Sequence, residues 1–177
     1  AVEKYFSSPC RIISVDNYIT SSEESFIDEL LDEGVSVVKA DVRNPLEIKE
    51  PVHYIIHAAG LASPYYYRKY PLETIDTAIM GAKNLLELSL KNRLQSFLLF
   101  SSSEIYGDPD DRFIPTPETY KGNVSSVGPR SCYDESKRLA ETIAMTYYHV
   151  YGAPVKIVRP FNVYGPGMKT NDYRVIP

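Results

Sequence analysis

Residues 131–137 read Ser-Cys-Tyr-Asp-Glu-Ser-Lys and open a long helical pattern. Tyr133 and Lys137 are four residues apart, so a helix places them on one face, one turn apart. A free tyrosine titrates near pH ~10, and a nearby ammonium lowers that pKa because it favours the phenolate. Such a pair can exchange a proton with a substrate hydroxyl while hydride moves to or from a nicotinamide. Because this spacing also arises by chance, the rest of the chain has to support the interpretation.

The composition fits one domain with nearly balanced charge. The 177 residues include 19 Lys and Arg against 23 Asp and Glu, which gives a net charge of −4. Both signs are interspersed, so the sequence has no basic surface for nucleic acid and no polybasic membrane patch. No apolar run approaches the roughly 20 residues of a membrane span, and no signal-peptide pattern opens the chain. We therefore expect neither nucleic acid nor a membrane as partner.

The two cysteines, Cys10 and Cys132, are far apart and lack the spacing of metal ligands. Disulfide frameworks are typical of oxidising compartments, and this chain has no such pattern. We expect reduced thiols, no metal site and a cytoplasmic location.

Strand and helix patterns alternate along the chain. Five short apolar runs predict strands at residues 11–15, 35–40, 52–59, 95–100 and 154–159. Helical spacing predicts helices at 21–33, 71–91 and 131–151, and residues 1–8 resemble the end of another helix. The expected apolar stripe of the last helix is Leu139, Ile143, Tyr147 and Val150, with Gly152 as its end. This alternation predicts an α/β fold with a doubly wound parallel sheet.

A segment rich in Pro, Gly, Asp and Asn, residues 108–130, predicts a long ordered loop. Loops of this length inside a compact domain are usually functional. In parallel sheets, ligands bind beyond the carboxyl ends of the strands. The candidate site residues described next follow expected strands directly.

Small or acidic residues follow the first three expected strands. Asp16 and Asn17 follow the first strand, and Asp41-Val42 follow the second. In a dinucleotide-binding fold, an acid such as Asp16 accepts hydrogen bonds from the adenosine ribose and disfavours a 2′-phosphate, which favours NAD over NADP. Asp41 can place a carboxylate near the adenine amine. A plain turn is the alternative interpretation of each. The third strand ends in residues small enough for close approach of a cofactor or for a tight turn: Ala58, Ala59 and Gly60.

Hydroxyls and one carboxylate follow the fourth strand, in Ser101-Ser102-Ser103-Glu104. The hydroxyls can hold a substrate oxygen and the glutamate can orient or protonate a sugar carbon or water, although a serine-rich turn is the alternative. Arg159 and Asn162 flank a Pro-Phe pair after the last strand, where an Asn amide binds a pyrophosphate or sugar or serves its own backbone. We interpret His57 as a packed histidine. Residues 65–67, three tyrosines, are interpreted as aromatic loop packing, with a stacking surface as the alternative.

Together these residues resemble the extended short-chain dehydrogenase/reductase family of NAD-dependent nucleotide-sugar epimerases, dehydratases and decarboxylases. Within that family, two stretches are most similar to UDP-glucuronate decarboxylases, residues 103–109 and 120–135. The resemblance covers essentially the whole chain and rests on six landmarks in order: residues 15–17, 41–42, 57–60, 101–107, 133–137 and 159–166.

The resemblance implies NAD as cofactor and a nucleotide sugar, with UDP-glucuronate favoured, as substrate. Tyr133, supported by Lys137, would remove the C4 hydroxyl proton as hydride passes to NAD. The resulting β-keto acid would lose carbon dioxide through an enolate, and return of the hydride would give UDP-xylose. Ser102 would hold the C4 oxygen, Glu104 would assist at C5, and Asn162 would contact the diphosphate. The expected substrate-binding residues are Ser103, Asn162 and Arg159.

Other reactions of the family, 4-epimerisation and 4,6-dehydration, stay alternatives. Dehydratases of the family usually carry an Asp-Glu pair where this chain has Ser103-Glu104, and many epimerases have no carboxylate at the position of Glu104. These differences favour decarboxylation. The alternative from another class is a non-catalytic, truncated Rossmann-like module, which would have no chemical need for Tyr133, Lys137 and Glu104.

The resemblance also implies features that this sequence lacks. The family begins with a strand and a Gly-x-x-Gly-x-x-Gly turn that binds the pyrophosphate, and the sequence contains no such motif. We therefore interpret residues 1–177 as the central part of a NAD-binding Rossmann-like domain, without the first strand and the C-terminal substrate domain. We expect an unpaired edge or gap in the sheet and weak NAD binding.

Two further departures from the family are Ala78, where an asparagine is usual, and Ser102, where threonine is more common. The second keeps the hydroxyl. The family commonly pairs through its two long helices, here residues 71–91 and 131–151, so we expect a homodimer.

Overall fold

The computed structural model describes residues 10–20 and 35–165. The helices expected at 1–8 and 21–33, and the last residue of the landmark at 159–166, lie outside the described residues. The chain divides into two compact units, residues 1–42 and 43–177, which are described separately.

The first unit contains two parallel strands, β1 (Ile12–Asp16) and β2 (Val35–Lys39). Their register runs from Ile12 opposite Val35 to Asp16 opposite Lys39. The Ala40 amide donates to the Asp16 carbonyl at 3.1 Å and extends the pairing past the strand ends. Parallel pairing therefore brings the residues that follow both strands to the same edge of this sheet.

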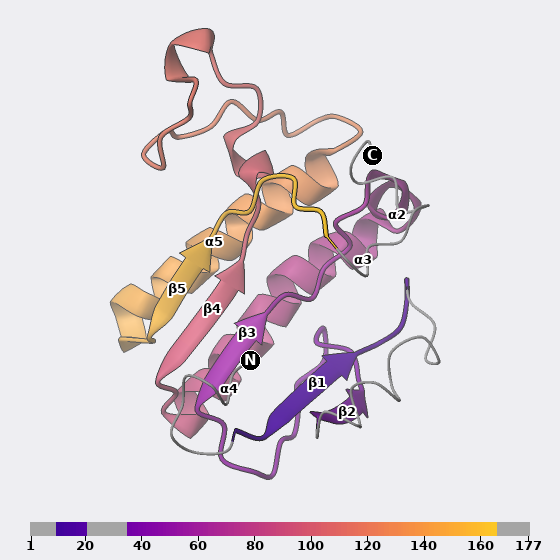
Figure 1. Ribbon diagram of the computed structural model, residues 1–177, viewed down its shortest axis with the longest axis vertical. Helices are drawn as coiled ribbons and strands as arrows, with labels where there is room; N and C mark the ends of the chain where they lie inside the picture. The colour runs from indigo at the N-terminus through magenta and orange to yellow at the C-terminus, as the bar shows by residue number, and fades with distance from the viewer. Residues whose placement is uncertain (1–9, 21–34, 166–177) are drawn as a thin grey trace. The chain divides into compact units, whose positions relative to one another are not determined.

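The second unit contains a parallel sheet of three strands, β3 (Tyr54–His57), β4 (Ser96–Phe100) and β5 (Val155–Val158), with β4 in the middle (Figure 1). Phe97 and Leu99 alternate along β4 and are almost completely buried, as expected for a central strand covered by helices. The described strands thus form two parallel sheets, and every predicted strand is present within a few residues of its expected bounds.

The helical run over residues 71–92, between β3 and β4, differs from the single helix predicted at 71–91. It consists of α3 (Pro71–Asp76), a π-helical segment η3 (Thr77–Gly81) and α4 (Ala82–Asn92). The π-helical segment contains the buried Ala78, and a pattern of apolar spacing does not distinguish an inserted residue of this kind.

The prediction of aromatic loop packing at 65–67 was wrong, because these tyrosines belong to a short helix, α2 (Pro64–Lys69). Proline at the first helical position starts this helix with its fixed φ. Tyr67 is buried and Tyr65 is exposed, so α2 presents one aromatic ring to the interior.

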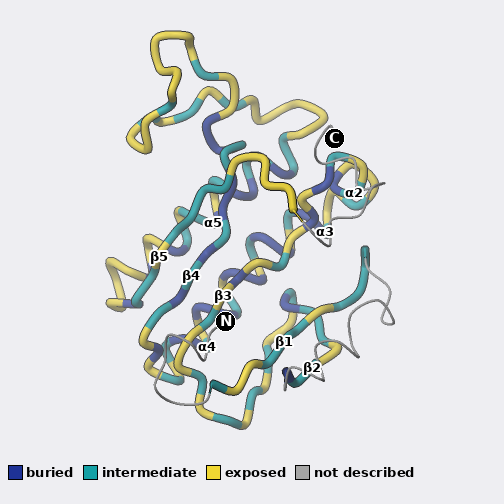
Figure 2. Tube along the Cα trace, viewed as in Figure 1, coloured by how far each residue is buried: buried dark blue, intermediate teal, exposed yellow. Residues whose placement is uncertain are grey.

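Helix α5 (Ser131–Tyr151) confirms the predicted long helix and ends at Gly152, whose φ of 67° suits glycine. Its predicted apolar stripe was wrong in part, since Leu139 and Val150 are 44% and 63% exposed. The buried positions of α5, dark blue in Figure 2, carry mainly small and polar residues, which allow close packing against neighbouring helices. These positions are Tyr133, Ser136, Lys137, Ala140, Ala144 and Tyr147.

The segment from β4 to α5 begins with two 3₁₀ turns, η4 (Ser103–Tyr106) and η5 (Asp111–Phe113). The rest of residues 108–130 is the predicted loop and is largely exposed (Figure 2). A single bridge joins Gly107 to Asn123 and closes the base of the loop. Gly107 has a φ of 65° and Gly122 a φ of 92°, so both ends of this closure use conformations that favour glycine.

Candidate active site

Tyr133 and Lys137 lie on the buried face of the first turns of α5. The Lys137 ammonium lies 5.8 Å from the centre of the Tyr133 ring and donates to the Phe100 carbonyl at 2.7 Å. Phe100 is the last residue of β4, two positions before Ser102. One hydrogen bond therefore fixes the lysine between the tyrosine and the carboxyl end of the central strand.

Burial lowers the pKa of Lys137 to about 8, and the carboxylate of Glu141 opposes part of that effect. The lysine is therefore mostly charged at neutral pH but close to the range in which it exchanges protons. A cation with this pKa beside a phenol suits a group that has to shuttle a proton.

The carboxyl end of β3 lies beside the same ammonium. A Cβ added to Gly60 would be 3.6 Å from Lys137 Nζ, so a larger side chain would crowd the charge. His57 is buried as predicted, and burial, followed by the charge of Lys137, lowers its pKa to about 4. Ala58 and Gly60 are exposed and Ala59 is half-buried. Small residues therefore keep backbone accessible next to the pair, as close approach of a cofactor requires.

The serine-rich segment forms a hydrogen-bonded turn at the end of β4. Ser102 is buried, and its Oγ accepts from the Glu104 amide at 3.2 Å. The Ser103 amide donates to the Pro160 carbonyl at 2.9 Å, which continues the β4–β5 pairing into the turn. Accepting one bond leaves the hydroxyl hydrogen of Ser102 able to donate to a ligand oxygen.

Glu104 and Arg130 join the turn to the start of α5. The Arg130 guanidinium donates to the Glu104 carboxylate, whose side chain is 33% exposed. Arg130 is also 3.8 Å from the carboxylate of Asp134. Arg130 was not among the site residues predicted from the sequence, although it lies only three residues before Tyr133.

Tyr67 was also not assigned to the site. Its ring stacks on that of Tyr133 with centres 5.1 Å apart and planes 17° apart. Burial raises the pKa of Tyr67, and its buried hydroxyl has no hydrogen-bond partner among the described residues. The stack fixes the plane of the Tyr133 ring from one side.

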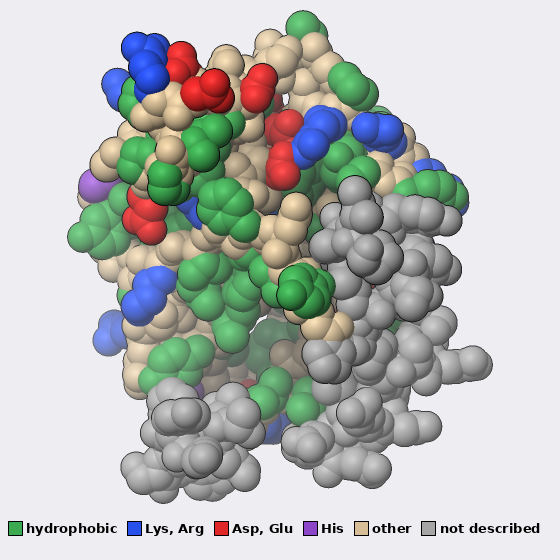
Figure 3. Space-filling model, turned by 45° about the horizontal axis from the view of Figure 1, so that its top comes forward, with side chains coloured by type: hydrophobic (Ala, Val, Ile, Leu, Met, Phe, Trp, Pro, Cys, Tyr) green, Lys and Arg blue, Asp and Glu red, His purple; other side chains and the backbone are tan. Residues whose placement is uncertain are grey.

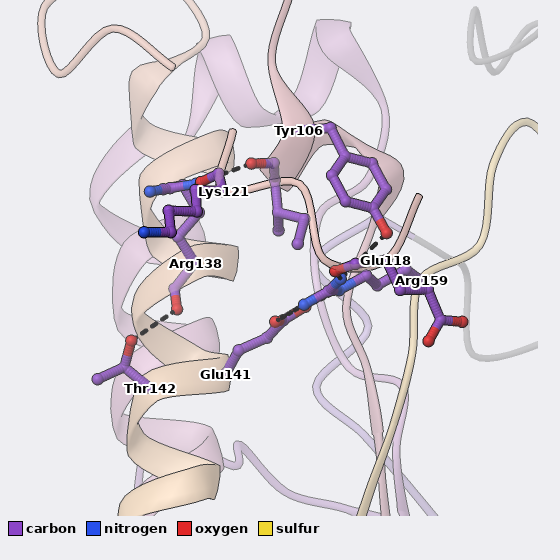
Figure 4. Close-up of polar contacts among 8 residues, drawn as sticks. Tyr106, Glu118, Lys121, Arg138, Glu141, Thr142 and Arg159 are labelled. Atoms are coloured by element: carbon purple, nitrogen blue, oxygen red, sulfur yellow. Dashed lines mark hydrogen bonds and ion pairs between the residues drawn. The ribbon is translucent and has the colours of Figure 1, made fainter. Parts of the chain in front are cut away.

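Arg159 has a different environment from that expected of a substrate ligand (Figure 4). Its Nε and Nη2 donate to the two carboxylate oxygens of Glu141 at 3.0 and 2.8 Å. Its Nη1 donates to Tyr106 Oη at 3.0 Å and to the Glu118 carbonyl at 2.8 Å. The Glu141 carboxylate raises the pKa of Arg159. Asn162 is exposed, and the substrate roles of Ser103, Asn162 and Arg159 stay predictions.

The residues expected around the adenosine come together within the first unit. Asn17 Nδ2 donates to Asp41 Oδ2 at 3.0 Å, and Asp16 Oδ1 accepts from the Tyr18 amide at 2.7 Å. The bond from the Tyr18 amide agrees with the alternative that Asp16 forms a turn. Asp16 is exposed. Val42 is buried beside Asp41 in the sequence. A ribose contact at Asp16 stays a prediction.

Several surface features bear on partners. Acidic and basic side chains are neighbours on the face drawn in Figure 3.

Across residues 10–20 and 35–165, no group of three or more His, Cys, Asp and Glu side chains could hold a metal ion. Cys10 and Cys132 are both free thiols. None of the helices in those ranges is long and apolar enough to cross a membrane.

A parallel α/β fold with a buried tyrosine–lysine pair at the end of a strand is typical of enzymes that use a nucleotide cofactor. The model of the NAD dependent epimerase/dehydratase family matches residues 1–177, and the chain belongs to that family. This result confirms the resemblance and the α/β fold drawn from the sequence.

Two similar proteins are UDP-glucuronic acid decarboxylases 1 and 3 of Arabidopsis thaliana. The first is 42% identical over 175 residues, which are 99% of this chain and 39% of that protein. The second is 42% identical over 165 residues, which are 93% of this chain and 47% of that protein. The chain therefore spans less than half the length of these relatives.

A solved structure shares the fold. The UDP-N-acetylglucosamine 4-epimerase from Methanobrevibacter ruminantium M1, in complex with UDP-N-acetylmuramic acid, matches with a TM-score of 0.76. The match covers 91% of this chain and 50% of that one at 24% identity. Identity at this level supports the fold and not the reaction.

Proposed function

We propose that the protein decarboxylates UDP-glucuronate to UDP-xylose, with NAD as cofactor. The observation that carries this proposal is the meeting of the Tyr133–Lys137 pair with the Ser102–Glu104 turn at the end of β4. Lys137 bonds to Phe100 at 2.7 Å, and Arg130, which opens α5, contacts Glu104. These contacts support a single site in which Tyr133 would be the base for the C4 hydroxyl and Glu104 the carboxylate for C5. The similarity to UDP-glucuronic acid decarboxylases supports the same substrate.

The small residues after β3, beside Lys137, support binding of a nicotinamide in the second unit. Gly60 leaves the space beside Lys137 open, and Tyr133, Lys137 and residues 58–60 would hold the nicotinamide end. Within the first unit, the residues predicted for the adenosine end stay Asp16, Asn17, Asp41 and Val42. When bound, NAD supplies the hydride acceptor and later the hydride donor.

The chain's own groups would divide the proton chemistry. Tyr133 would take the proton of the C4 hydroxyl, and the cationic Lys137 would stabilise the phenolate that results. Ser102, with its hydrogen available, would hold the C4 oxygen as it becomes a carbonyl. Glu104 would then orient the sugar and assist the protonation of C5 after carbon dioxide leaves.

The test is to supply the natural full-length protein with NAD and UDP-glucuronate and to measure carbon dioxide and the sugar product. Release of carbon dioxide with formation of UDP-xylose would support the proposal. Formation of an epimer or of a 4-keto-6-deoxy sugar without carbon dioxide would replace it with one of the two other family reactions. A protein that binds the nucleotide sugar and never turns it over would be a non-catalytic module.

We also propose a homodimer through the helical faces, in a cytoplasmic protein. Apolar side chains on the outer faces of α3 and α5 support a helix-to-helix interface, since Leu72, Leu139 and Val150 are exposed. Sedimentation of the protein should give twice the protomer mass, and Val150→Asp should reduce it to the protomer mass. A mass unchanged by this substitution would exclude this surface.

A further inference from the structure

Glu104 lies in a four-residue turn, η4, whose two ends are attached to the segment after β5. At the first end, the Ser101 amide donates to the Val158 carbonyl at 2.8 Å and the Ser103 amide donates to the Pro160 carbonyl at 2.9 Å. These backbone bonds fix where the turn begins. Backbone bonds of this kind form with almost any side chains, so they do not explain which side chains the turn carries.

The second end is held by side chains. Tyr106 is buried, and its hydroxyl accepts from Arg159 Nη1 at 3.0 Å, while the Arg159 guanidinium carbon lies 5.2 Å from the centre of its ring. The same Nη1 donates to the Glu118 carbonyl in the long loop. The Tyr106 carbonyl accepts from the Asn123 amide at 2.9 Å. One guanidinium therefore ties the turn and the loop together.

Arg159 is itself immobilised by Glu141. The two-pronged contact uses Nε and Nη2, and the side chains of Arg159 and Glu141 are 26% and 12% exposed. Two parallel hydrogen bonds fix the plane of the guanidinium, which a lysine cannot reproduce. With Nε and Nη2 on Glu141 and Nη1 on Tyr106 and Glu118, little of the guanidinium is left for a substrate.

We propose that Arg159 is a positioning residue for Glu104, acting through Tyr106, in place of the substrate ligand expected from the sequence. The inference rests on the proposed function, because it assigns Glu104 to the decarboxylation step. A carboxylate on a turn fixed at both ends keeps its orientation towards C5. Loosening one end should therefore slow the loss of carbon dioxide more than the initial oxidation at C4.

Tyr106→Phe is the sharper test, because it removes the bond from Arg159 and keeps the ring. A substitution of Arg159 would also release Glu141, which influences Lys137. The matched control is Tyr147→Phe, which removes the 2.6 Å bond from another buried tyrosine hydroxyl to Glu87, between α5 and α4. Arg159→Lys is the second variant, because it retains the positive charge and loses the two parallel hydrogen bonds to Glu141.

With NAD and UDP-glucuronate, Tyr106→Phe and Arg159→Lys should each slow carbon dioxide release about tenfold or more, as small misplacements do. In Tyr106→Phe, formation of NADH should stay within about twofold of the unsubstituted protein, so NADH should accumulate. Arg159→Lys also changes the contacts of Glu141, so only its carbon dioxide release is compared. Tyr147→Phe should change neither rate. Equal slowing of both rates in Tyr106→Phe, or no slowing of either, would overturn the proposal.

Amide hydrogen exchange gives a readout that does not depend on turnover. In Tyr106→Phe, the Asn123 amide, which donates to Tyr106, should exchange faster, while Tyr147→Phe should leave it unchanged. If the unsubstituted protein releases no carbon dioxide from UDP-glucuronate, the proposed function fails. The exchange result then still decides the coupling of Arg159 to the turn, because unchanged exchange in Tyr106→Phe would refute it.

Discussion

The Tyr133–Lys137 pair and the Ser102–Tyr106 turn meet at the end of β4 but are held in different ways. The pair lies within two turns of one helix, and burial gives Lys137, which donates to the Phe100 carbonyl, its lowered pKa. The turn depends on bonds donated by Arg130 and Arg159 and on the bond that the Ser103 amide donates to the Pro160 carbonyl, and these partners are remote in the sequence. Burial therefore sets the proton affinity of one region, and hydrogen bonds set the orientation of the other.

The largest expected effect comes from removing the base itself. Tyr133→Phe keeps the ring stacked on Tyr67 but loses the phenol, so oxidation of the C4 hydroxyl should fall by about 10²- to 10⁴-fold. The measurement is the rate of NADH formation from UDP-glucuronate. Tyr148→Phe, at an exposed position on the same helix, is the control and should keep the full rate. An active Tyr133→Phe variant would remove the assigned role.

The hydrogen-bonded region should be the more sensitive one to backbone change. Gly122→Ala should cost about 3 kcal/mol of unfolding free energy, because the new Cβ would lie 2.5 Å from the Ile105 carbonyl oxygen at a φ of 92°. Gly152→Ala is the matched control, with a φ of 67° and nothing within 4 Å of the Cβ. It should cost about 1 kcal/mol. Urea unfolding measures both, and equal costs would mean that the loop closure yields easily.

Acid should weaken the buried region through His57. Its pKa is about 4 in the folded chain against 6.5 as the ordinary value, so the unfolded chain binds more protons between these two pH values. Stability is therefore lost as pH falls from 6.5 towards 4, by about 2 kcal/mol at pH ~5. Between pH ~7.5 and ~5, the free energy of unfolding of His57→Gln should fall by about 2 kcal/mol less than that of the unsubstituted protein. Parallel losses would show that His57 is not the sensitive group.

Alkali should have the smallest effect, through Lys137. Its pKa of about 8, against 10.5 ordinarily, means that the cost of burying the charge is full below pH 8 and is relieved as pH rises from 8 to 10.5. Relative to Lys137→Met, the free energy of unfolding of the unsubstituted protein should rise by about 1 kcal/mol between pH ~7 and ~9. Chemical unfolding at the two pH values measures this difference. A constant difference would place the lysine pKa outside that range.

The two regions also differ in how far the sequence predicts them. The spacing of Tyr133 and Lys137 on one helix face, and the alternation of strands and helices, are local patterns, and the structure bears them out. The Arg130–Glu104 and Arg159–Tyr106 contacts join residues 26 and 53 positions apart, and no local pattern encodes them. The apolar stripe failed at Leu139 because the helix buries alanines and catalytic candidates where larger side chains were expected.

The most direct test of the division between the two regions is Glu104→Gln in the natural full-length protein. With NAD and UDP-glucuronate, this variant should form NADH at a rate close to that of the unsubstituted protein, because Tyr133 and Lys137 are intact. Carbon dioxide should then appear much more slowly, and NADH should accumulate. Carbon dioxide released at the full rate, or NADH formation lost together with it, would contradict the account.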